Sequence, residues 1–172
     1  MTTSPTTPHS LQAQLLAARA TVATAESLTG GLVGAAFTSV SGSSAVYLGG
    51  VVTYATELKV SVLGVPAAVV SGPGVVSPEC AEAMAVGVRA LTGATYAVST
   101  TGVAGPEAQE GKAVGTVFVG VAGPAGVGHV ACALDGDRDA IRAQTVQAAL
   151  SALSEQVSTD RGSSVGEETP LG

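Results

Sequence analysis

The spacing of apolar and polar positions divides the first half of the chain into alternating helices and strands. In chain order the pattern predicts a helix over 10–20, a strand over 21–25, a helix over 27–40, a strand over 45–55 and short helices over 56–63 and 66–70. Ser10 is the expected N-cap of the first helix. Gly49 and Gly50 interrupt the second strand, which indicates a bulge or a close approach of another chain segment.

The second half begins with a helix and continues into strands. Ser77 is the expected N-cap and Pro78 the first residue of this helix, since proline is favoured there. Its apolar face is predicted to consist of Ala81, Met84, Ala85 and Val88. The rest is predicted to form a strand that runs into a glycine loop over 96–105, a hairpin of strands over 113–123 and 126–134 with a Gly-Pro turn, and a last helix capped by Asp137 that ends near Val157.

This order of elements predicts an α/β fold: one three-layer α/β/α domain whose mixed sheet contains an antiparallel hairpin. The domain is expected to span residues 10–157. Residues 1–9 and 158–172 are rich in small and polar side chains, so disordered tails are expected there.

Composition narrows the class of protein. The 172 residues are 46% hydrophobic and only 12% charged, with a net charge of −6. An acidic chain of this kind is not expected to bind nucleic acid, because the phosphate backbone would be repelled. The sequence has neither a long apolar run nor a signal peptide, so we expect a cytoplasmic protein without membrane contact. Because the charge is low and the strands are apolar, association of two copies into a homodimer is plausible.

Metal chemistry has little support. Cys80 and Cys132 lack the spacing of a metal or redox motif and are expected to be small buried apolar residues. His9 and His129 have no third ligand nearby in the sequence. We therefore expect neither a metal nor another cofactor.

The stretch "TVATAESLTGG" places Ser27 between a strand and a helix, followed by Thr29, Gly30 and Gly31. Free N–H groups gather at a helix start, and glycines there let a ligand approach the backbone. This predicts a binding corner. A plain alternative is that Ser27 or Thr29 caps the helix and the glycines pack against a neighbour.

The chain has two lysines, Lys59 and Lys112, and Lys59 follows the second strand by about one helical turn. A serine nucleophile needs a base, and no histidine is well placed for that role. A desolvated lysine can serve instead. Tyr54 ends the strand that precedes Lys59, and its hydroxyl is expected to reach the same rim. The alternative, a solvated surface lysine, stays open.

Arg142 continues the apolar stripe of the last helix toward its start, and Arg138 lies one step before it. An inward arginine needs an anionic partner. That partner is either Glu26, Glu57 or an aspartate of the loop, or it is a bound phosphate or carboxylate.

The loop "STTGVAGP" also follows a strand end, and Thr101, Gly102 and Gly105 can present hydroxyl and N–H groups to an anion. It is not a Walker A loop, and the chain has no G-x-G-x-x-G motif. Nucleoside triphosphate chemistry is therefore disfavoured.

Taken together, "TAESLTGG", "VVTYATELK", "GVVSPE", "STTGVAGP", "GTVFVGVA" and "GDRDAIRAQTVQAAL" resemble the C-terminal domain of the competence/damage-inducible protein CinA. The resemblance covers about residues 10–157 in order and does not extend to the pyrophosphatase domain that precedes this one in CinA. Two positions depart from it: Leu28 stands where relatives often have cysteine, and the loop after Pro106 reads "EAQEGKAVGTV".

The resemblance implies a metal-free serine amidase that hydrolyses the carboxamide of nicotinamide mononucleotide, giving nicotinate mononucleotide and ammonia in pyridine nucleotide salvage. The family's serine nucleophile falls on Ser27, its tyrosine and lysine on Tyr54 and Lys59, and its functional arginine on Arg142. We expect neutral Lys59 to act as base, Tyr54 to relay the proton or orient the lysine, and Arg142 to bind the phosphate. An amidase for another small carboxamide, or a nucleotide-binding module without activity, remains the alternative.

Overall fold

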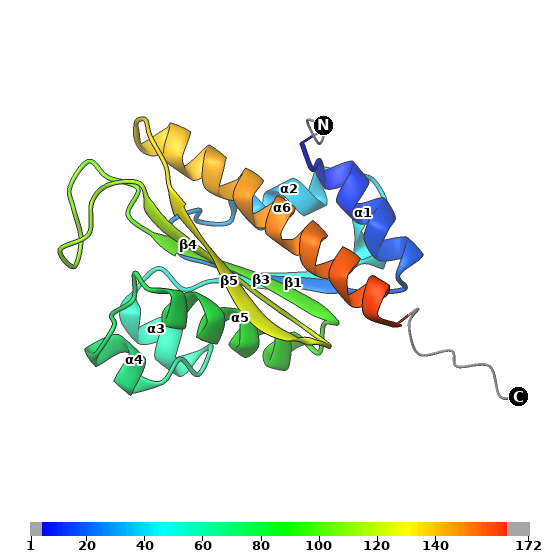
Figure 1. Ribbon diagram of the computed structural model, residues 1–172, viewed down its shortest axis with the longest axis horizontal. Coiled ribbons are helices and arrows are strands. Elements are labelled where there is room, and N and C mark those ends of the chain that lie inside the picture. The colour runs from blue at the N-terminus through cyan, green and yellow to red at the C-terminus, as the bar shows by residue number, and fades with distance from the viewer. Residues whose placement is uncertain (1–4, 165–172) are drawn as a thin grey trace, which may run out of the picture.

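A mixed five-stranded sheet forms the centre of the protein in the computed structural model, which describes residues 5–164 (Figure 1). Its strands are β1 (Val22–Glu26), β2 (Tyr47–Val52), β3 (Tyr96–Gly102), β4 (Thr116–Gly123) and β5 (Gly126–Ala133). The order across the sheet is β2-β1-β3-β4-β5. β1 is parallel to both β2 and β3, whereas β4 is antiparallel to β3 and to β5.

Helices cover both faces of the sheet. Those of the described residues are α1 (Pro8–Ala17), α2 (Leu32–Thr38), α3 (Thr56–Ser61), α4 (Ala67–Ser71), α5 (Pro78–Thr92), α6 (Arg138–Ser164) and the 3-10 helix η1 (Ser43–Ala45). α1, α2 and α6 lie on one face, and α5 lies on the other together with α3 and α4 (Figure 1). The predicted α/β fold, with three layers and an antiparallel hairpin, is confirmed.

Each face has its own apolar core. Under α6 the core includes Leu15, Phe37 and Leu153, and under α5 it includes Met84 and Val88. These side chains are large and buried, whereas the strand residues between them are mostly Ala and Val. Small strand residues let the helices pack closely on both faces, so the sheet and its helices hold the ends of the parallel strands in fixed positions.

Local sequence signals located several elements correctly. The Ser77 hydroxyl accepts a hydrogen bond from the N–H of Cys80 at the start of α5, and Asp137 accepts from the N–H of Ala140 at the start of α6. The backbone register shifts opposite the Gly49 region of β2, and a Cβ at Gly50 would overlap the hydroxyl of Thr24. The predicted bulge and close approach are therefore both present.

Several helix limits differ from the predicted ones, and the short helices α1, α2 and α3 all end two or three residues earlier than expected. α1 begins at Pro8 because Thr7 is its N-cap, and Ser10 instead completes a capping box with Thr7. The last helix does not end near Val157 but runs to Ser164. The expected tails at 1–9 and 158–172 therefore contain helical residues, and their outer parts lie outside the described residues. A further difference concerns residues 27–31, which form a turn before α2.

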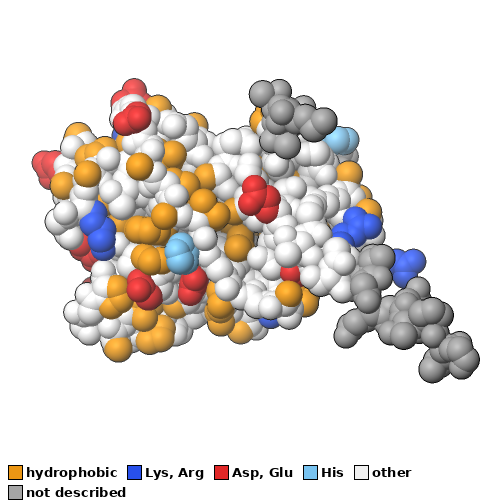
Figure 2. Space-filling model, viewed as in Figure 1, with side chains coloured by type: hydrophobic (Ala, Val, Ile, Leu, Met, Phe, Trp, Pro, Cys, Tyr) orange, Lys and Arg blue, Asp and Glu red, His pale blue; other side chains and the backbone are white. Residues whose placement is uncertain are grey.

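β5 is one edge of the sheet, and apolar side chains gather over it on the face seen in Figure 2. Val127 and Val130 are exposed there, and His129 lies 2.8 Å from the carboxylate of Glu82 on α5. The expected homodimer stays a prediction. Among the described residues, no helix combines the length and the apolar character that crossing a membrane requires.

Candidate active site

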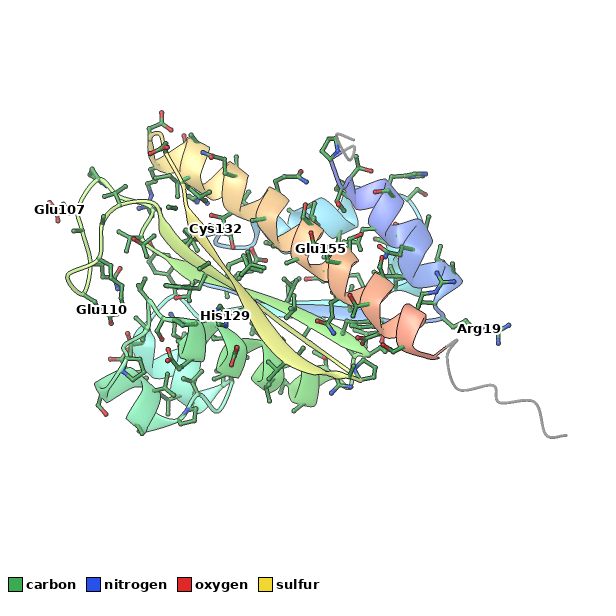
Figure 3. All side chains as sticks on the ribbon, viewed as in Figure 1. Arg19, Glu107, Glu110, His129, Cys132 and Glu155 are labelled. Atoms are coloured by element: carbon green, nitrogen blue, oxygen red, sulfur yellow. The ribbon has the colours of Figure 1, made fainter. Side chains whose placement is uncertain are left out.

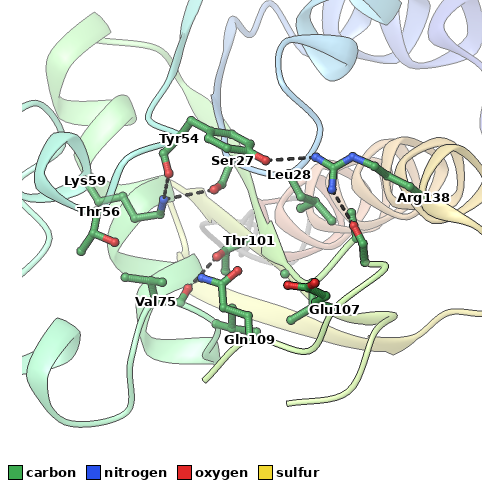
Figure 4. A pocket seen from close by; sticks show the side chains of 15 residues that line it. Ser27, Leu28, Tyr54, Thr56, Lys59, Val75, Thr101, Glu107, Gln109 and Arg138 are labelled. Atoms are coloured by element: carbon green, nitrogen blue, oxygen red, sulfur yellow. Dashed lines mark hydrogen bonds between the residues drawn. The ribbon is translucent and has the colours of Figure 1, made fainter. Parts of the chain in front are cut away.

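A pocket of about 170 Å³ lies where the carboxyl ends of β1, β2 and β3 meet (Figure 4). Parallel strands end at the same edge of a sheet, so the segments that follow them are brought together there. The lining consists of Ser27, Leu28, Tyr54, Thr56, Lys59, Val75, Val76, Thr101, Gly102, Val103, Ala104, Gly105, Glu107, Gln109 and Arg138. One cavity thus receives residues from the loops after β1, β2 and β3, from α3, from the segment before α5 and from the start of α6.

Ser27 and Lys59 are in direct contact in this pocket. The Lys59 Nζ lies 3.1 Å from the Ser27 Oγ, although 32 residues separate the two in the chain. Ser27 directly follows β1, where its N–H is fixed by the carbonyl of Thr100 on β3. Lys59 lies on α3, which follows the neighbouring strand β2. The parallel pairing of β1 with β2 therefore sets this contact.

The surroundings of Lys59 favour an uncharged amine. The residue is 1% exposed, and burial lowers the pKa of its amine. It takes part in none of the ion pairs of the described residues. Its Nζ lies 2.7 Å from the carbonyl oxygen of Thr53 and 3.3 Å from that of Tyr54.

The hydrogen-bond geometry fits both protonation states of this amine, since a charged lysine would donate its third N–H to the Ser27 oxygen. Carbonyl oxygens only accept, so Thr53 and Tyr54 take two N–H groups of the Lys59 amine. A neutral amine has two N–H groups and one lone pair, and the third direction points at the Ser27 hydroxyl. In that state the hydroxyl donates its proton to the lysine lone pair. This is the arrangement that a general base requires before a serine attacks.

Tyr54 contributes in a different way from the one expected. Its hydroxyl was assigned to relay a proton or to orient Lys59, but it is the main-chain carbonyl of Tyr54 that contacts the lysine. The phenol is 60% exposed and accepts a hydrogen bond from Arg138 at 3.0 Å. The phenol therefore lies at the rim of the pocket, away from the Ser27–Lys59 contact (Figure 4).

Glu26 organises the turn after β1. Its buried carboxylate accepts hydrogen bonds from the hydroxyl of Thr29 and from the N–H groups of Gly31, Val33 and Gly34. These N–H groups belong to the start of α2, which we expected to face a ligand. Glu26 occupies them instead, because a carboxylate at a helix start is stabilised by the free N–H groups. Sequence reasoning considered Glu26 only as an arginine partner.

The glycines of this turn adopt backbone conformations that favour glycine. Gly30 and Gly31 have φ values of +58° and +105°, a region that residues with a Cβ rarely adopt. Neither residue lines the pocket, and neither does Thr29, whose hydroxyl is buried against Glu26 and Thr100. Gly30, Gly31 and Thr29 thus shape the turn that presents Ser27, and their contact with substrate stays a prediction.

Arg142 also supports this turn from outside the pocket. Its Nε donates to the carbonyl of Leu28 at 3.0 Å, its Nη2 lies 3.4 Å from the carbonyl of Thr29, and its Nη1 is 3.7 Å from Asp139. An exposed aspartate of α6 itself is thus the nearby anion, and main-chain oxygens accept hydrogen bonds from two of the three guanidinium nitrogens. Arg142 does not line the pocket, whereas Arg138 does.

The loop after β3 supplies the third wall. Thr101, Gly102 and Gly105 all line the pocket, as expected from the sequence. The Thr101 hydroxyl, however, donates to the carbonyl of Val75 at 2.6 Å, so it fastens this wall to the segment before α5. A Cβ at Gly102 would come within 2.7 Å of the carbonyl oxygen of Thr116, so glycine is required for packing there.

The rest of this loop is anchored by Glu110, on the projecting segment between β3 and β4 (Figure 3). Its carboxylate accepts from the N–H groups of Val75 at 3.1 Å and Val76 at 3.0 Å. Lys112 donates to the carbonyls of Pro73 and Val76 and lies 3.9 Å from Glu110. The sequence carried one signal of this anchor, a lysine in a chain with only two.

No group of three or more potential metal-binding side chains is found among residues 5–164. The polar groups of the pocket are instead a serine, a tyrosine, two threonines, a lysine, an arginine, a glutamine and a carboxylate. Glu107, Gln109 and Arg138 had not been singled out as pocket residues. Only Arg138 left a signal in the sequence, its place on the inward stripe of the last helix.

Comparison with protein families gives a match to the CinA C-terminal domain over residues 5–157. A CinA-like protein of Frankia casuarinae is 48% identical over 131 residues, which are 76% of this chain and 30% of that protein. A putative competence-damage inducible protein of Geobacillus sp. is 47% identical over 128 residues, 74% of this chain and 31% of that protein. The chain thus spans about a third of the length of these curated relatives.

Solved structures of the same superfamily superpose on most of this chain and on nearly all of their own length. A CinA superfamily protein from Klebsiella pneumoniae superposes with a TM-score of 0.84 at 34% identity, covering 88% of this chain and 98% of that one. A competence/damage inducible protein from Agrobacterium tumefaciens gives a TM-score of 0.79 at 36% identity, covering 89% and 97%.

Proposed function

Because this chain belongs to the CinA C-terminal domain family, we propose that it is an amidohydrolase that converts nicotinamide mononucleotide to nicotinate mononucleotide and ammonia. The identity of the substrate is inferred from the resemblance of the motifs around Ser27, Tyr54 and Lys59 to those of the family. The observation that carries the proposal is the 3.1 Å contact between the Lys59 Nζ and the Ser27 Oγ, made with the other two amine positions held by carbonyls.

The first step is attack of the Ser27 oxygen on the carboxamide carbon. The neutral amine of Lys59 accepts the hydroxyl proton as the new C–O bond forms. Thr53 and Tyr54 each hold an N–H of the amine through a carbonyl oxygen, so the lone pair stays directed at the hydroxyl. Those same oxygens stabilise the lysine once it is charged.

The tetrahedral intermediate carries a negative oxygen that needs donors. The N–H groups of Leu28 and Thr29 directly follow the nucleophile and have no hydrogen bond among the described residues. We assign them to the oxyanion, because backbone N–H groups beside a serine nucleophile are suited to it. Arg142 holds the carbonyl of Leu28, which belongs to the same peptide group as the N–H of Thr29, and so orients that donor.

Collapse of this intermediate breaks the carbon–nitrogen bond. The charged Lys59 returns its proton to the leaving amide nitrogen, which departs as ammonia, and the acyl group remains on Ser27 as an ester. Lys59, neutral again, then takes a proton from water as the water oxygen attacks this ester. The proton returns to Ser27, and the acid product leaves.

The pocket suits the ring of such a substrate. Leu28, Val75, Val76, Val103 and Ala104 give it apolar walls around the Ser27–Lys59 pair. Its volume of about 170 Å³ is below the ~300–1,000 Å³ usual for sites that enclose a whole small ligand. The pocket therefore encloses the reacting end, and the remainder of a nucleotide extends toward the rim.

Incubation of the purified chain with nicotinamide mononucleotide tests the proposal. Equal amounts of ammonia and nicotinate mononucleotide are expected, and Ser27→Ala should abolish both, because the acyl acceptor is lost. Ser39→Ala, which changes an exposed serine of the C-cap of α2, is the matched control. Full activity of the Ser27→Ala protein would overturn the assignment. Ammonia release from another carboxamide, with none from this nucleotide, would keep the amidase and change its substrate.

A further inference from the structure

We propose that Arg138 is the residue that recognises the phosphate of the substrate, and that the site is thereby specific for a phosphorylated nucleoside. This inference rests on the proposed function, because it assigns the charged end of the same ligand. It moves the phosphate-binding role from Arg142, to which the family resemblance had led, to an arginine one helical turn earlier on α6.

The first argument is one of position. The lining contains two basic side chains, Lys59 and Arg138. Lys59 is buried against Ser27 and is needed there as a neutral base. Arg142 lies outside the lining, and its guanidinium is directed at the carbonyls of Leu28 and Thr29 and at the carboxylate of Asp139. Arg138 is therefore the cation of the pocket that a bound anion can reach.

The second argument is one of unused capacity. The Arg138 Nη1 donates to the carbonyl of Gly105 at 2.7 Å, and its Nη2 donates to the hydroxyl of Tyr54 at 3.0 Å. Both partners are neutral, and Arg138 takes part in none of the ion pairs of the described residues. A guanidinium has five N–H groups in a planar fork that fits two phosphate oxygens. Its charge and several of its donors are thus available to a ligand.

The third argument is one of distance along the ligand. The enclosed part of the pocket accepts the carboxamide and ring, so the phosphate of a mononucleotide lies toward the rim. Arg138 and Tyr54 are both exposed and stand at that rim, opposite the Ser27–Lys59 pair (Figure 4). The partners of Arg138 come from the loops after β2 and β3. A phosphate held there draws both loops toward the ligand through one side chain.

One feature of the lining opposes a phosphate. Glu107 contributes a carboxylate from the projecting loop, and it is not paired with Arg138 (Figure 3). Binding of a phosphorylated ligand therefore depends on Arg138 to offset this charge. Without the arginine, the lining still presents the Glu107 carboxylate to the phosphate and has lost the cation that offsets it.

The test compares binding of nicotinamide mononucleotide with that of nicotinamide riboside, which lacks the phosphate. Titration calorimetry is done on the Ser27→Ala protein, so that neither ligand is consumed. We expect the nucleotide to bind more tightly than the riboside. Adding Arg138→Gln should weaken nucleotide binding by about tenfold, because a charge-assisted hydrogen bond is lost, and leave riboside binding unchanged. Arg138→Lys should fall between the two, since it keeps the charge and loses the fork.

Two control variants, each also in the Ser27→Ala protein, sharpen this test. Arg19→Gln removes the same charge at the far end of the molecule from the projecting loop and should leave the ratio of the two affinities unchanged (Figure 3). Arg142→Gln should also leave that ratio unchanged, because the residue does not line the pocket. Equal weakening of both ligands by Arg138→Gln, an unchanged ratio, or a ratio lost in Arg142→Gln instead would each overturn the inference.

Failure of the proposed function gives a different result. It is read from turnover by the wild-type protein, whereas the role of Arg138 is read from the affinity ratio of an inactive variant. A protein that binds the nucleotide through Arg138 without hydrolysing it would keep this inference and lose the amidase. A protein that hydrolyses nucleotide and riboside equally well, with equal affinities, would do the reverse.

Discussion

The amine of Lys59 is buried among a hydroxyl, two carbonyl oxygens and apolar side chains, and burial lowers its pKa. Only the neutral amine can accept the serine proton. The rate of amide hydrolysis should therefore rise with pH as this amine loses its proton. The rise is expected below the ordinary lysine pKa of 10.5.

Lys59→Met should remove this rising limb and lower kcat by about 100- to 10,000-fold, the usual contribution of a general base. The measurement is kcat and kcat/KM for nicotinamide mononucleotide as a function of pH. Arg89→Met, a cationic residue near the end of α5 and remote from this pocket, is the control. A Lys59→Met protein with normal kcat and only a raised KM would make Lys59 a binding residue.

The same lowered pKa makes stability depend on pH. The unfolded chain holds the Lys59 proton more tightly than the folded chain, so between the lowered pKa and 10.5 the unfolded state binds more protons. The free energy of unfolding therefore rises with pH in that range. The free energy of unfolding, measured by urea at a series of pH values, should rise more steeply with pH in the wild type than in Lys59→Met. Equal dependence on pH in the two proteins would contradict this prediction.

At the scale of elements, the turn between β1 and α2 depends on backbone conformations that need glycine. Gly31→Ala is expected to lower the free energy of unfolding by about 1–2 kcal/mol, because its φ of +105° strains a residue with a Cβ. Gly128→Ala on β5 is the matched control, since a Cβ there meets no atom within 4 Å and its φ lies outside the strained range. Urea unfolding measures both, and equal effects would contradict the conformational explanation.

This turn also shows which parts of the fold could be predicted from the sequence. Ser77-Pro78 and Asp137 are capping signals whose effect is local, and the hairpin between β4 and β5 needs only a two-residue turn. The start of α2 at Leu32 was not predictable in this way. It depends on Glu26, whose carboxylate reaches the N–H groups of residues up to eight positions later.

The site was predictable to the same extent. Strand order alone brings the segments of Ser27 and Lys59 together, because both follow parallel strands that are neighbours. The arginine was not predictable. Arg138 and Arg142 lie on the same stripe of α6, and only the position of the loops after β2 and β3 decides which of them reaches the pocket.

At the scale of the whole molecule, the pocket depends on the attachment of the loop between β3 and β4 to the segment before α5. Glu110→Gln leaves one acceptor oxygen for two N–H groups, those of Val75 and Val76. The loop should become more mobile, and KM should rise about three- to tenfold, as expected for one hydrogen bond of ~0.5–1.5 kcal/mol. Steady-state kinetics measures this change.

Hydrogen exchange distinguishes this cause from a direct effect on the ligand. The amides of Val75 and Val76 should exchange faster in the Glu110→Gln protein without any ligand present. Glu155→Gln, an exposed change on α6, is the control and should alter neither quantity. A raised KM with unchanged exchange would mean that Glu110 acts on the ligand and not on the loop.

The pairing of β1 with β2 makes the active site sensitive to local unfolding at one edge of the sheet. Ser27 and Lys59 belong to successive strand–helix units and meet only when Ala25 pairs with Val51 and Glu26 with Val52. β2 is an outermost strand, with few neighbours to retain it. Detachment of this single strand would separate Ser27 from its base while nearly all helices stay folded. Enzymatic turnover therefore reports whether this edge of the sheet is intact.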